Sequence, residues 1–535
     1  MTRMTRLLPF LAAVAVCAAQ DWQTLPDVPR EQRRGAPPKS IDEAVVFTIN
    51  EPIHTPYALD LIRKVSSDVL IRAWFKWRNA PDWSQYRQFA QQAHALGMMF
   101  GGGVTCSALY DGENGLTAAE VSDMATRDAE GKLVNAWNTA GVHHGTLSNP
   151  KYLEYILRWG RQQIDHGADY LFMDEITAAL ERREGYDDYS IRAFREHLLR
   201  QYCQGQQWSQ ADARWRERFQ VDLGDRAMCP DGSMGSFDYR AYLQKRGFTA
   251  DPLAAGNPLA GDWREFRQQR DDSAWKTLTD QLREYARGQG RMLYLSGNGI
   301  AKYVDLQVLG VWGLWRVKDG RVDLADSQMA DWQSIVRRGQ TVAGRKLPVV
   351  LFHDWGFGGF PWLKVPPSDR ELWMRVRGAE IYAAGGFFAF PILGPFGCDA
   401  GRDGTLREVA RQTAFYAAHR DLYLKARPVA VDFTKGETAG LSTALWVRDS
   451  PPAVIVHAIN RQTANGAPAP RKSVKMILPF DSAPRAVQVV SPDGREVRAE
   501  IGHDANGLSL TLSALEAYAV AVLEFDKLPA LDQPR

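Results

Sequence analysis

Eight short apolar runs recur between residues 44 and 392, and amphipathic segments lie between them. The runs are AVVFTIN (44–50), VLIRAWF (69–75), MMFGGGV (98–104), YLFMDEI (170–176), MLYLSGN (292–298), VDLQVLG (304–310), PVVLFHD (348–354) and GFFAFPI (386–392). Their length and bounding residues are typical of β-strands that are covered on both faces. Eight strands that alternate with helices predict an α/β protein with a (β/α)8 TIM barrel.

The segments between the runs carry helix signals. WSQYRQFAQQAHALG (83–97) and YLEYILRWGRQQIDHG (152–167) are amphipathic, and Ser148, Asn149 and Pro150 stand just before the second segment. A capping residue followed by a proline in the first turn indicates the start of a helix.

Two further stretches accompany this barrel, which we place at residues 41–425 after a linker at 20–40. Residues 178–290, after the fourth run, turn polar and helical. Because loops that follow barrel strands emerge at the mouth, we expect this insertion to act as a lid, with a separate helical domain as the alternative. Residues 426–535 contain short alternating runs such as AVIVHAIN and AVAVLEF, which predict an antiparallel β-sandwich. We expect an accessory role for it, and carbohydrate binding is the alternative.

The N-terminus has the pattern of a secretory signal peptide. Arg3 and Arg6 precede an apolar stretch at residues 7–16, and small residues lead to a cleavage site after Ala19. The stretch is shorter than the roughly 20 residues that span a bilayer, and no later segment is long and apolar enough. We therefore expect a secreted or periplasmic protein without a membrane span. A lipoprotein anchor at Cys17 is the less favoured alternative.

Cleavage after Ala19 leaves the cysteines Cys106, Cys203, Cys229 and Cys398. Export permits disulfides, and we expect a bridge between Cys203 and Cys229 because both lie in the helical insertion. Four buried thiols are the alternative.

The charge balance argues against a nucleic-acid partner. Lys and Arg number 65 against 63 Asp and Glu, and no long basic stripe appears. Aromatic residues make up 11% of the chain and include 17 Trp, several of them in expected loops. This enrichment suggests flat faces on which a ligand can stack.

Polar residues close several of the apolar runs. In TIM barrels the active site lies at the C-terminal ends of the strands, so polar residues there indicate chemistry. The strand ends offer Asn50, Glu51, Trp74, Asp174, Glu175, Asn298, His353 and Asp354. For Glu51 alone, capping of the next helix is an equally good interpretation. Asp174 and Glu175 are adjacent, and two neighbouring carboxylates repel each other and raise at least one pKa.

Paired carboxylates in an aromatic-lined pocket are the chemistry of glycoside hydrolysis, in which one acid protonates the leaving oxygen and the other attacks or activates water. Successive strand residues point to opposite faces, so Asp174 and Glu175 cannot both point into the barrel unless the strand has already turned. Asp174 shares its face with Phe172, and Glu175 shares its face with Met173. The sequence leaves open which pair faces inward.

GADYLFMDE (167–175) resembles the fourth-strand signature of many barrel glycoside hydrolases, in which an apolar run precedes an Asp nucleophile. AEIYAAGGFFAFP (379–391) and RDLYLKARPVA (420–430) resemble the last barrel unit of poorly characterised bacterial glycosyl hydrolase families, and HAINR with SPDG is similar to their C-terminal domain. The resemblance implies that Asp174 is the nucleophile and Glu175 a neighbouring acid. The fifth and sixth strands close in LSGNG and LGVWG without a Glu, so Glu175, Asp354 and Glu51, in that order, are the candidates for the acid/base.

Other motifs do not change this interpretation. HExxH and GxSxG do not occur, and we expect no metal and no cofactor. The triple glycine at 101–103 lacks the spacing of a phosphate loop, and a close helix–strand contact explains it.

Together these features predict an exported glycoside hydrolase that acts on a poly- or oligosaccharide. A catalytically inactive barrel that binds glycans is the alternative, and the sequence does not determine the oligomeric state. The predicted catalytic residues are Asp174, Glu175 and Asp354, and the predicted sugar-binding residues are Glu51, Trp74, Trp77, His144, Asn298, Trp312, His353 and Trp355.

Overall fold

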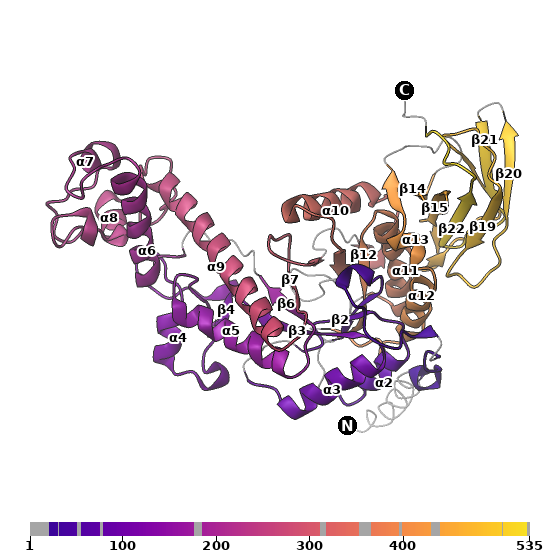
Figure 1. Cartoon of the computed structure of the whole chain (residues 1–535), viewed down its shortest axis with the longest axis horizontal. Helices are drawn as coiled ribbons and strands as arrows, with labels where there is room; N and C mark the ends of the chain where they lie inside the picture. The colour runs from indigo at the N-terminus through magenta and orange to yellow at the C-terminus, as the bar shows by residue number, and fades with distance from the viewer. Residues whose placement is uncertain are drawn as a thin grey trace, which may run out of the picture.

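A computed structural model describes residues 21–29, 32–50, 55–74, 79–175, 184–310, 317–352, 365–394, 398–429, 439–504 and 507–531. A helical arm, a barrel and a β-sandwich follow one another along the long axis of the molecule (Figure 1). Within the described residues, no helix is both long enough and apolar enough to cross a membrane.

The central barrel consists of eight parallel strands. They are β1 (Phe47–Asn50), β2 (Val69–Ile71), β3 (Met99–Thr105), β6 (Tyr170–Asp174), β7 (Tyr294–Gly297), β8 (Gln307–Gly310), β11 (Val349–Phe352) and β12 (Phe387–Leu393). Neighbours in the sheet follow the order of the chain, and β12 pairs with β1. A parallel bridge between Asn298 and Val308 joins β7 to β8. Each of these strands lies within its predicted run or extends one residue beyond it, so the predicted barrel is confirmed.

Helices follow most of the strands. They are α2 (Ala58–Arg63), α3 (Trp83–Ala95), α5 (Pro150–Asp165), α9 (Ala260–Gly288), α10 (Met329–Ala343), α11 (Pro367–Ala383), α12 (Leu406–Ala418) and α13 (Asp421–Leu424). The predicted start of α5 is confirmed, because the Asn149 side chain accepts a 2.9 Å hydrogen bond from the Lys151 amide. The alternation fails at one place: residues 298–306, all described, connect β7 to β8 without a helix.

The triple glycine of β3 is explained by close packing on both faces of the strand. A Cβ on Gly101 would lie 2.6 Å from the ring of Tyr170 on β6. A Cβ on Gly102 would lie 1.9 Å from the side chain of Gln163 on α5. The Gln163 amide also bonds to the backbone N and O of Gly103, at 2.9 and 3.1 Å. The predicted helix–strand contact is therefore confirmed.

The insertion after β6 forms a helical body with its own core. It contains α6 (Asp188–Leu198), a π-helical turn (Leu199–Gln204), α7 (Arg214–Phe219) and α8 (Tyr239–Arg246). The long helix α9 joins this body to the barrel, because Trp263 packs in the core of the insertion and Leu282 packs in the core of the barrel. Figure 1 shows α6, α7 and α8 at the end of α9 that is remote from the barrel strands. Residues 176–183, which lead from β6 into the insertion, lie outside the described residues, so closure over the mouth stays a prediction.

The predicted Cys203–Cys229 bridge is wrong, because both residues are free thiols. Cys229 is buried in the core of the insertion, and Cys203 packs against that core from a half-buried position. Cys106 and Cys398 are also free and are buried. The alternative of four buried thiols therefore holds for three of them, because Cys203 is only half-buried.

The C-terminal region forms two antiparallel sheets. One contains β13 (Arg427–Val429), β14 (Leu441–Arg448), β15 (Ala453–Asn460), β22 (Tyr518–Glu524) and β19 (Ala486–Val490), and the other contains β18 (Val474–Ile477), β21 (Gly507–Leu512) and β20 (Ala499–Asp504). Apolar side chains of both sheets share one core, in which Val454 of β15 and Leu510 of β21 are fully buried. This arrangement is the predicted β-sandwich.

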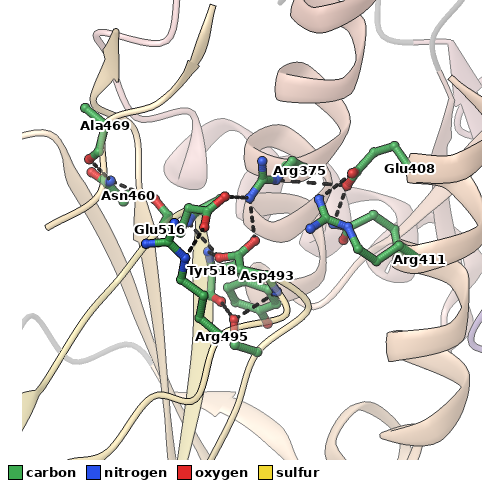
Figure 2. A network of polar contacts seen from close by, with 12 residues as sticks. Arg375, Glu408, Arg411, Asn460, Ala469, Asp493, Arg495, Glu516 and Tyr518 are labelled. Carbon is green, nitrogen blue, oxygen red and sulfur yellow. Dashed lines mark hydrogen bonds and ion pairs between the residues drawn. The ribbon is translucent and has the colours of Figure 1, made fainter. Parts of the chain in front are cut away.

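A network of ion pairs fastens the sandwich to the barrel (Figure 2). Arg375 of α11 donates to Asp493 at 2.7 Å and to Glu516 at 2.6 Å, and both acids belong to the sandwich. The second oxygen of Asp493 accepts hydrogen bonds from the amides of Ala517 and Tyr518. The side chain of Asp493 is only 3% exposed, so the barrel supplies the cation that neutralises a buried acid of the sandwich.

Candidate active site

Asp174 is the last residue of β6 and faces the inside of the barrel. Phe172, two residues earlier, contacts Phe352 of β11 with 6.2 Å between the ring centroids. Because β7 and β8 lie between β6 and β11 in the barrel, a contact between the two rings must pass through the interior, and it fixes Phe172 as an interior residue. Side chains two apart in a strand share a face, so Asp174 also points inward. The question that the sequence left open is thereby answered.

Glu175 does not follow the alternation of the strand. Its backbone has a φ of 55°, in the left-handed region that non-glycine residues seldom adopt. The strand has therefore turned at this residue. Strained backbone of this kind is common at functional sites, and Arg72, Trp137 and Asn138 around the same mouth also have positive φ values.

Two donors from the long loop after β3 hold the carboxylate of Glu175. The hydroxyl of Ser107, two residues beyond the end of β3, donates to Oε2. The indole of Trp137, in the 3-10 turn Ala136–Asn138, donates to Oε1 at 3.0 Å. Ser107 and Trp137 thus fix the position of the acid from two points of one loop.

The surroundings of Glu175 favour its protonated form up to about neutral pH. Burial raises the pKa of Glu175 to about 7, and the charge of Asp174 acts in the same direction. The Trp137 hydrogen bond and the charges of His144 and Arg72 act in the opposite direction. The prediction that one of the two adjacent acids has a raised pKa is confirmed, and the acid is Glu175.

Arg72 brings a positive charge into the mouth of the barrel. It directly follows β2, is buried, and places its guanidinium 4.9 Å from the centre of the Phe172 ring. Its charge lowers the pKa of Glu175 and acts in the same sense on the buried Tyr170. The guanidinium thus lies over the same face of β6 that carries Asp174.

His144 lies in the same cluster as Glu175. It ends the short strand β5 (Val142–His144), which pairs with β4 (Ala108–Tyr110) in the loop after β3. Its Nδ1 lies 2.6 Å from Oε2 of Glu184, and its ring meets Trp137 edge-on with 6.2 Å between the centroids. His144 was predicted to bind the sugar, and that role stays a prediction.

Asn298 and Trp74 have structural roles in the described part of the chain. Asn298 bridges to Val308, and its Oδ1 accepts a 3.3 Å hydrogen bond from the Gly310 amide, so it helps to close the barrel. Its predicted role in sugar binding stays a prediction. The prediction that Trp74 stacks on a sugar is wrong. Its ring is 5% exposed and packs against Trp159 of α5 with 5.8 Å between the centroids. The chain has already left β2 at Trp74 and directs the ring into the layer between strands and helices.

Six predicted site residues lie outside the described residues. They are Glu51, Trp77, Trp312, His353, Asp354 and Trp355. Their roles in sugar binding, and that of Asp354 in catalysis, stay predictions.

Asn50, the last residue of β1, is a further polar residue at the C-terminal end of the barrel strands. Its side chain is fully buried, and neither amide atom has a hydrogen-bond partner in the structure as described. The pairing with β12 shifts register between Ile49 and Asn50. Irregularities of this kind re-aim side chains next to active sites, and a buried amide without a partner is costly unless something binds it.

Sequence reasoning missed four residues of this cluster: Arg72, Ser107, Trp137 and Glu184. For Arg72 a signal was present, because a charge interrupts the apolar run VLIRAWF. Trp137 stands 38 residues before Glu175 in the chain, and only the fold brings the two together. Glu184 follows Glu175 by nine residues, but no local sequence pattern marks it as a partner of His144. Among the described residues, no group of three or more His, Cys, Asp or Glu side chains is placed to hold a metal ion.

The sequence matches no protein-family model and no curated protein sequence. The fold, by contrast, resembles solved structures. A cycloisomaltooligosaccharide glucanotransferase from Paenibacillus sp., solved with cycloisomaltoheptaose, superposes with a TM-score of 0.55 at 10% identity, covering 91% of this chain and 86% of the other. α-L-fucosidase isoenzyme 2 from Paenibacillus thiaminolyticus gives a TM-score of 0.51 at 11% identity, covering 90% and 99%. At these identities the likeness establishes a shared barrel fold.

Proposed function

We propose that the protein is an exported glycoside hydrolase that cleaves a poly- or oligosaccharide with Asp174 and Glu175. The observation that carries this proposal is the pair of adjacent acids with different environments at the end of β6. Glu175 has a pKa of about 7 through burial and the charge of Asp174, whereas Asp174 faces the barrel interior on the same face of β6 as Phe172, over which Arg72 lies. Two acids whose environments separate their pKa values define an acid and an ionised partner.

The chemistry follows from these two protonation states. Glu175 carries a proton at neutral pH in a large part of the molecules and donates it to the leaving glycosidic oxygen. Asp174, ionised, attacks the anomeric carbon or stabilises the oxocarbenium-like transition state. The hydrogen bonds from Ser107 and Trp137 hold Glu175 once it has become a carboxylate, which is then ready to take a proton from the incoming water.

The comparisons support the same class of substrate. The two proteins whose folds are similar are named as a glucanotransferase and a fucosidase, and one was solved with a bound cyclic oligosaccharide. The exposed indole of Trp137 beside Glu175 offers a flat face on which a sugar ring can stack.

The test is a screen of glycans with the purified protein, followed by two variants. Asp174→Asn is expected to lower turnover by on the order of a hundredfold or more, because it removes a positioned charge from the transition state, while glycan binding remains. Glu175→Gln is expected to lower turnover on natural glycans but much less on aryl glycosides with a good leaving group, since these need no proton. Glu154→Gln, an exposed acid of α5, serves as the matched control.

Two results would overturn this assignment. Wild-type turnover in a folded Asp174→Asn protein would remove Asp174 from the mechanism. If Glu175→Gln also kept wild-type turnover, the proposed hydrolase mechanism would be rejected. Binding of a glycan without any turnover in the wild-type protein would favour the inactive, glycan-binding barrel. Transfer to a second sugar instead of water would show as elongated products in the same screen.

Export is part of the proposal. The charged start and apolar stretch at residues 1–19 support it. Expression with the full N-terminus should give a mature chain that begins at Gln20 in the periplasm or the medium. A product that keeps residues 1–19, or that is lipidated at Cys17, would contradict the predicted cleavage.

A further inference from the structure

The helical insertion contacts the catalytic cluster through a buried acid, Glu184. Glu184 is the first described residue after Glu175, and its side chain is 1% exposed. Its Oε2 lies 2.6 Å from Nδ1 of His144, whose side chain is 14% exposed. A pair this short and this buried is a charge-assisted contact, and the carboxylate favours the imidazolium form of the histidine.

His144 lies next to the catalytic acid. The ring of His144 packs edge-on against Trp137, whose indole donates to Glu175. His144 is also one of the charges that lower the pKa of Glu175, against the raising effects of burial and Asp174. Glu184, His144, Trp137 and Glu175 therefore form one connected cluster, in which the insertion supplies the outermost member.

The backbone around Glu184 is fixed to the loop after β3. The amide of Gly185 donates to Oγ1 of Thr126 at 2.9 Å, and the amide of Tyr186 donates to the carbonyl of Arg127 at 2.9 Å. The carboxylate of Glu184 is thus held at a set place relative to β5, which carries His144.

We propose that Glu184 is a positioning residue that keeps His144 protonated next to Glu175, so that the insertion sets the pH range in which Glu175 donates its proton. The inference rests on the proposed role of Glu175 and adds a regulator to it. The other charges that act on Glu175 are those of Asp174 and Arg72, and the buried Tyr152 lies near it as well. Arg267 of α9 is close enough to Glu184 for the acid to raise the pKa of Arg267, against the larger lowering by burial.

The direction in which the titration midpoint of Glu175 moves distinguishes a role of Glu184 through His144 from a direct effect of the Glu184 charge. If Glu184 acted directly on Glu175, the change Glu184→Gln would remove a negative charge and ease the ionisation of Glu175. If it acts through His144, the same change leaves a neutral imidazole, removes a positive charge beside Glu175, and makes its ionisation harder. The titration midpoint of Glu175 then moves to higher pH by about one unit.

The experiment follows the side-chain carboxyl of Glu175 by NMR of protein labelled with 13C in glutamate, with the signal assigned through Glu175→Gln. This readout needs no substrate, so it is decided independently of whether any glycan is hydrolysed. Glu184→Gln and His144→Gln are each expected to raise the midpoint, and the double variant should show no further increase. Glu184→Asp, which retains the charge, should restore most of the wild-type midpoint. His144→Gln removes the same positive charge, so it carries the test by itself if Glu184→Gln does not fold.

The neighbouring pair His143 and Asp111 provides a matched control. His143 stands next to His144 on β5, and its Nε2 lies 3.0 Å from Oδ1 of Asp111. The side chain of Asp111 is 64% exposed. Asp111→Asn likewise removes the carboxylate partner of a histidine, but it should leave the titration midpoint of Glu175 unchanged. An unchanged or lower midpoint in Glu184→Gln, or shifts of the two single variants that add in the double variant, would overturn the proposal.

Discussion

The indole nitrogen of Trp137 donates a 3.0 Å hydrogen bond to Oε1 of Glu175, although 38 residues separate the two in the chain. The donor stabilises the ionised carboxylate and opposes the effects of burial and of Asp174 on the pKa of Glu175. The same indole is exposed to solvent at the mouth of the barrel. Trp137 thus lowers the pKa of Glu175 and also offers a flat face on which a ligand can stack.

We predict that two substitutions of Trp137 separate these roles. Trp137→Phe keeps a ring but removes the donor, so the pKa of Glu175 should rise and the basic limb of the pH–activity profile should move upward by up to about one unit. Trp137→Ala should show the same shift and also a higher KM, because the stacking face is lost. Profiles of kcat and kcat/KM against pH measure both effects. Identical KM values for the two variants would contradict a stacking role.

We predict that Asn50 holds a hydroxyl group of the substrate. Asn50→Leu has a similar volume and removes a buried amide that has no partner among the described residues, so the free energy of unfolding should rise by about 1 kcal/mol. At the same time KM should rise by about tenfold, because the hydroxyl loses its partner. Urea unfolding and steady-state kinetics on the same preparation test the two effects. A stabilised variant with an unchanged KM would show that Asn50 does not contact the substrate.

The ion pairs between barrel and sandwich should contribute to stability according to their burial. Arg375→Ala leaves Asp493 buried without its cation, so the free energy of unfolding should fall by about 3 kcal/mol. Arg495, in the same network, is 67% exposed and lies 3.6 Å from Glu516, and Arg495→Ala should have an effect close to zero. Chemical unfolding monitored by fluorescence compares the two. Equal losses would show that burial does not decide the contribution.

Glu371 on α11 should make the protein less stable as the pH rises. Burial raises its pKa to about 7, and the charge of Glu408 adds to this effect. Between about pH 4.3, its value in an unfolded chain, and pH 7, the unfolded state has lost a proton that the folded state still holds. Stability therefore falls across this window as pH increases.

Glu371→Gln removes this effect. The variant should be more stable than the wild type at pH 8 by about 1 kcal/mol, after allowance for solvent screening of a half-buried group, and the difference should vanish at pH 4. Unfolding midpoints at the two pH values give the comparison, with the exposed Asp526→Asn as control. A constant difference at both pH values would indicate a packing effect instead of a titration.

The barrel could be predicted from the sequence because each of its strands is a local pattern. A strand that is buried on both faces must be an apolar run, and the helix start at Asn149 and Pro150 follows from the backbone preferences of those two residues. The place of Asp174 at the end of β6 follows from the same pattern. The connection from β7 to β8 shows the limit of this reasoning, because strand and helix alternation alone does not require a helix in each interval.

The direction of Asp174 and the state of Glu175 were decided only by the tertiary structure. Alternation gives the relative faces of strand residues, but the contact between Phe172 and Phe352 across the barrel is needed to say which face is inside. The raised pKa of Glu175 depends on burial and on charges from three separate segments, and the Trp137 donor comes from a distant loop. A sequence specifies which residues can carry charge, whereas distance and exclusion of water, which determine how strongly those charges act, arise only when the chain has folded.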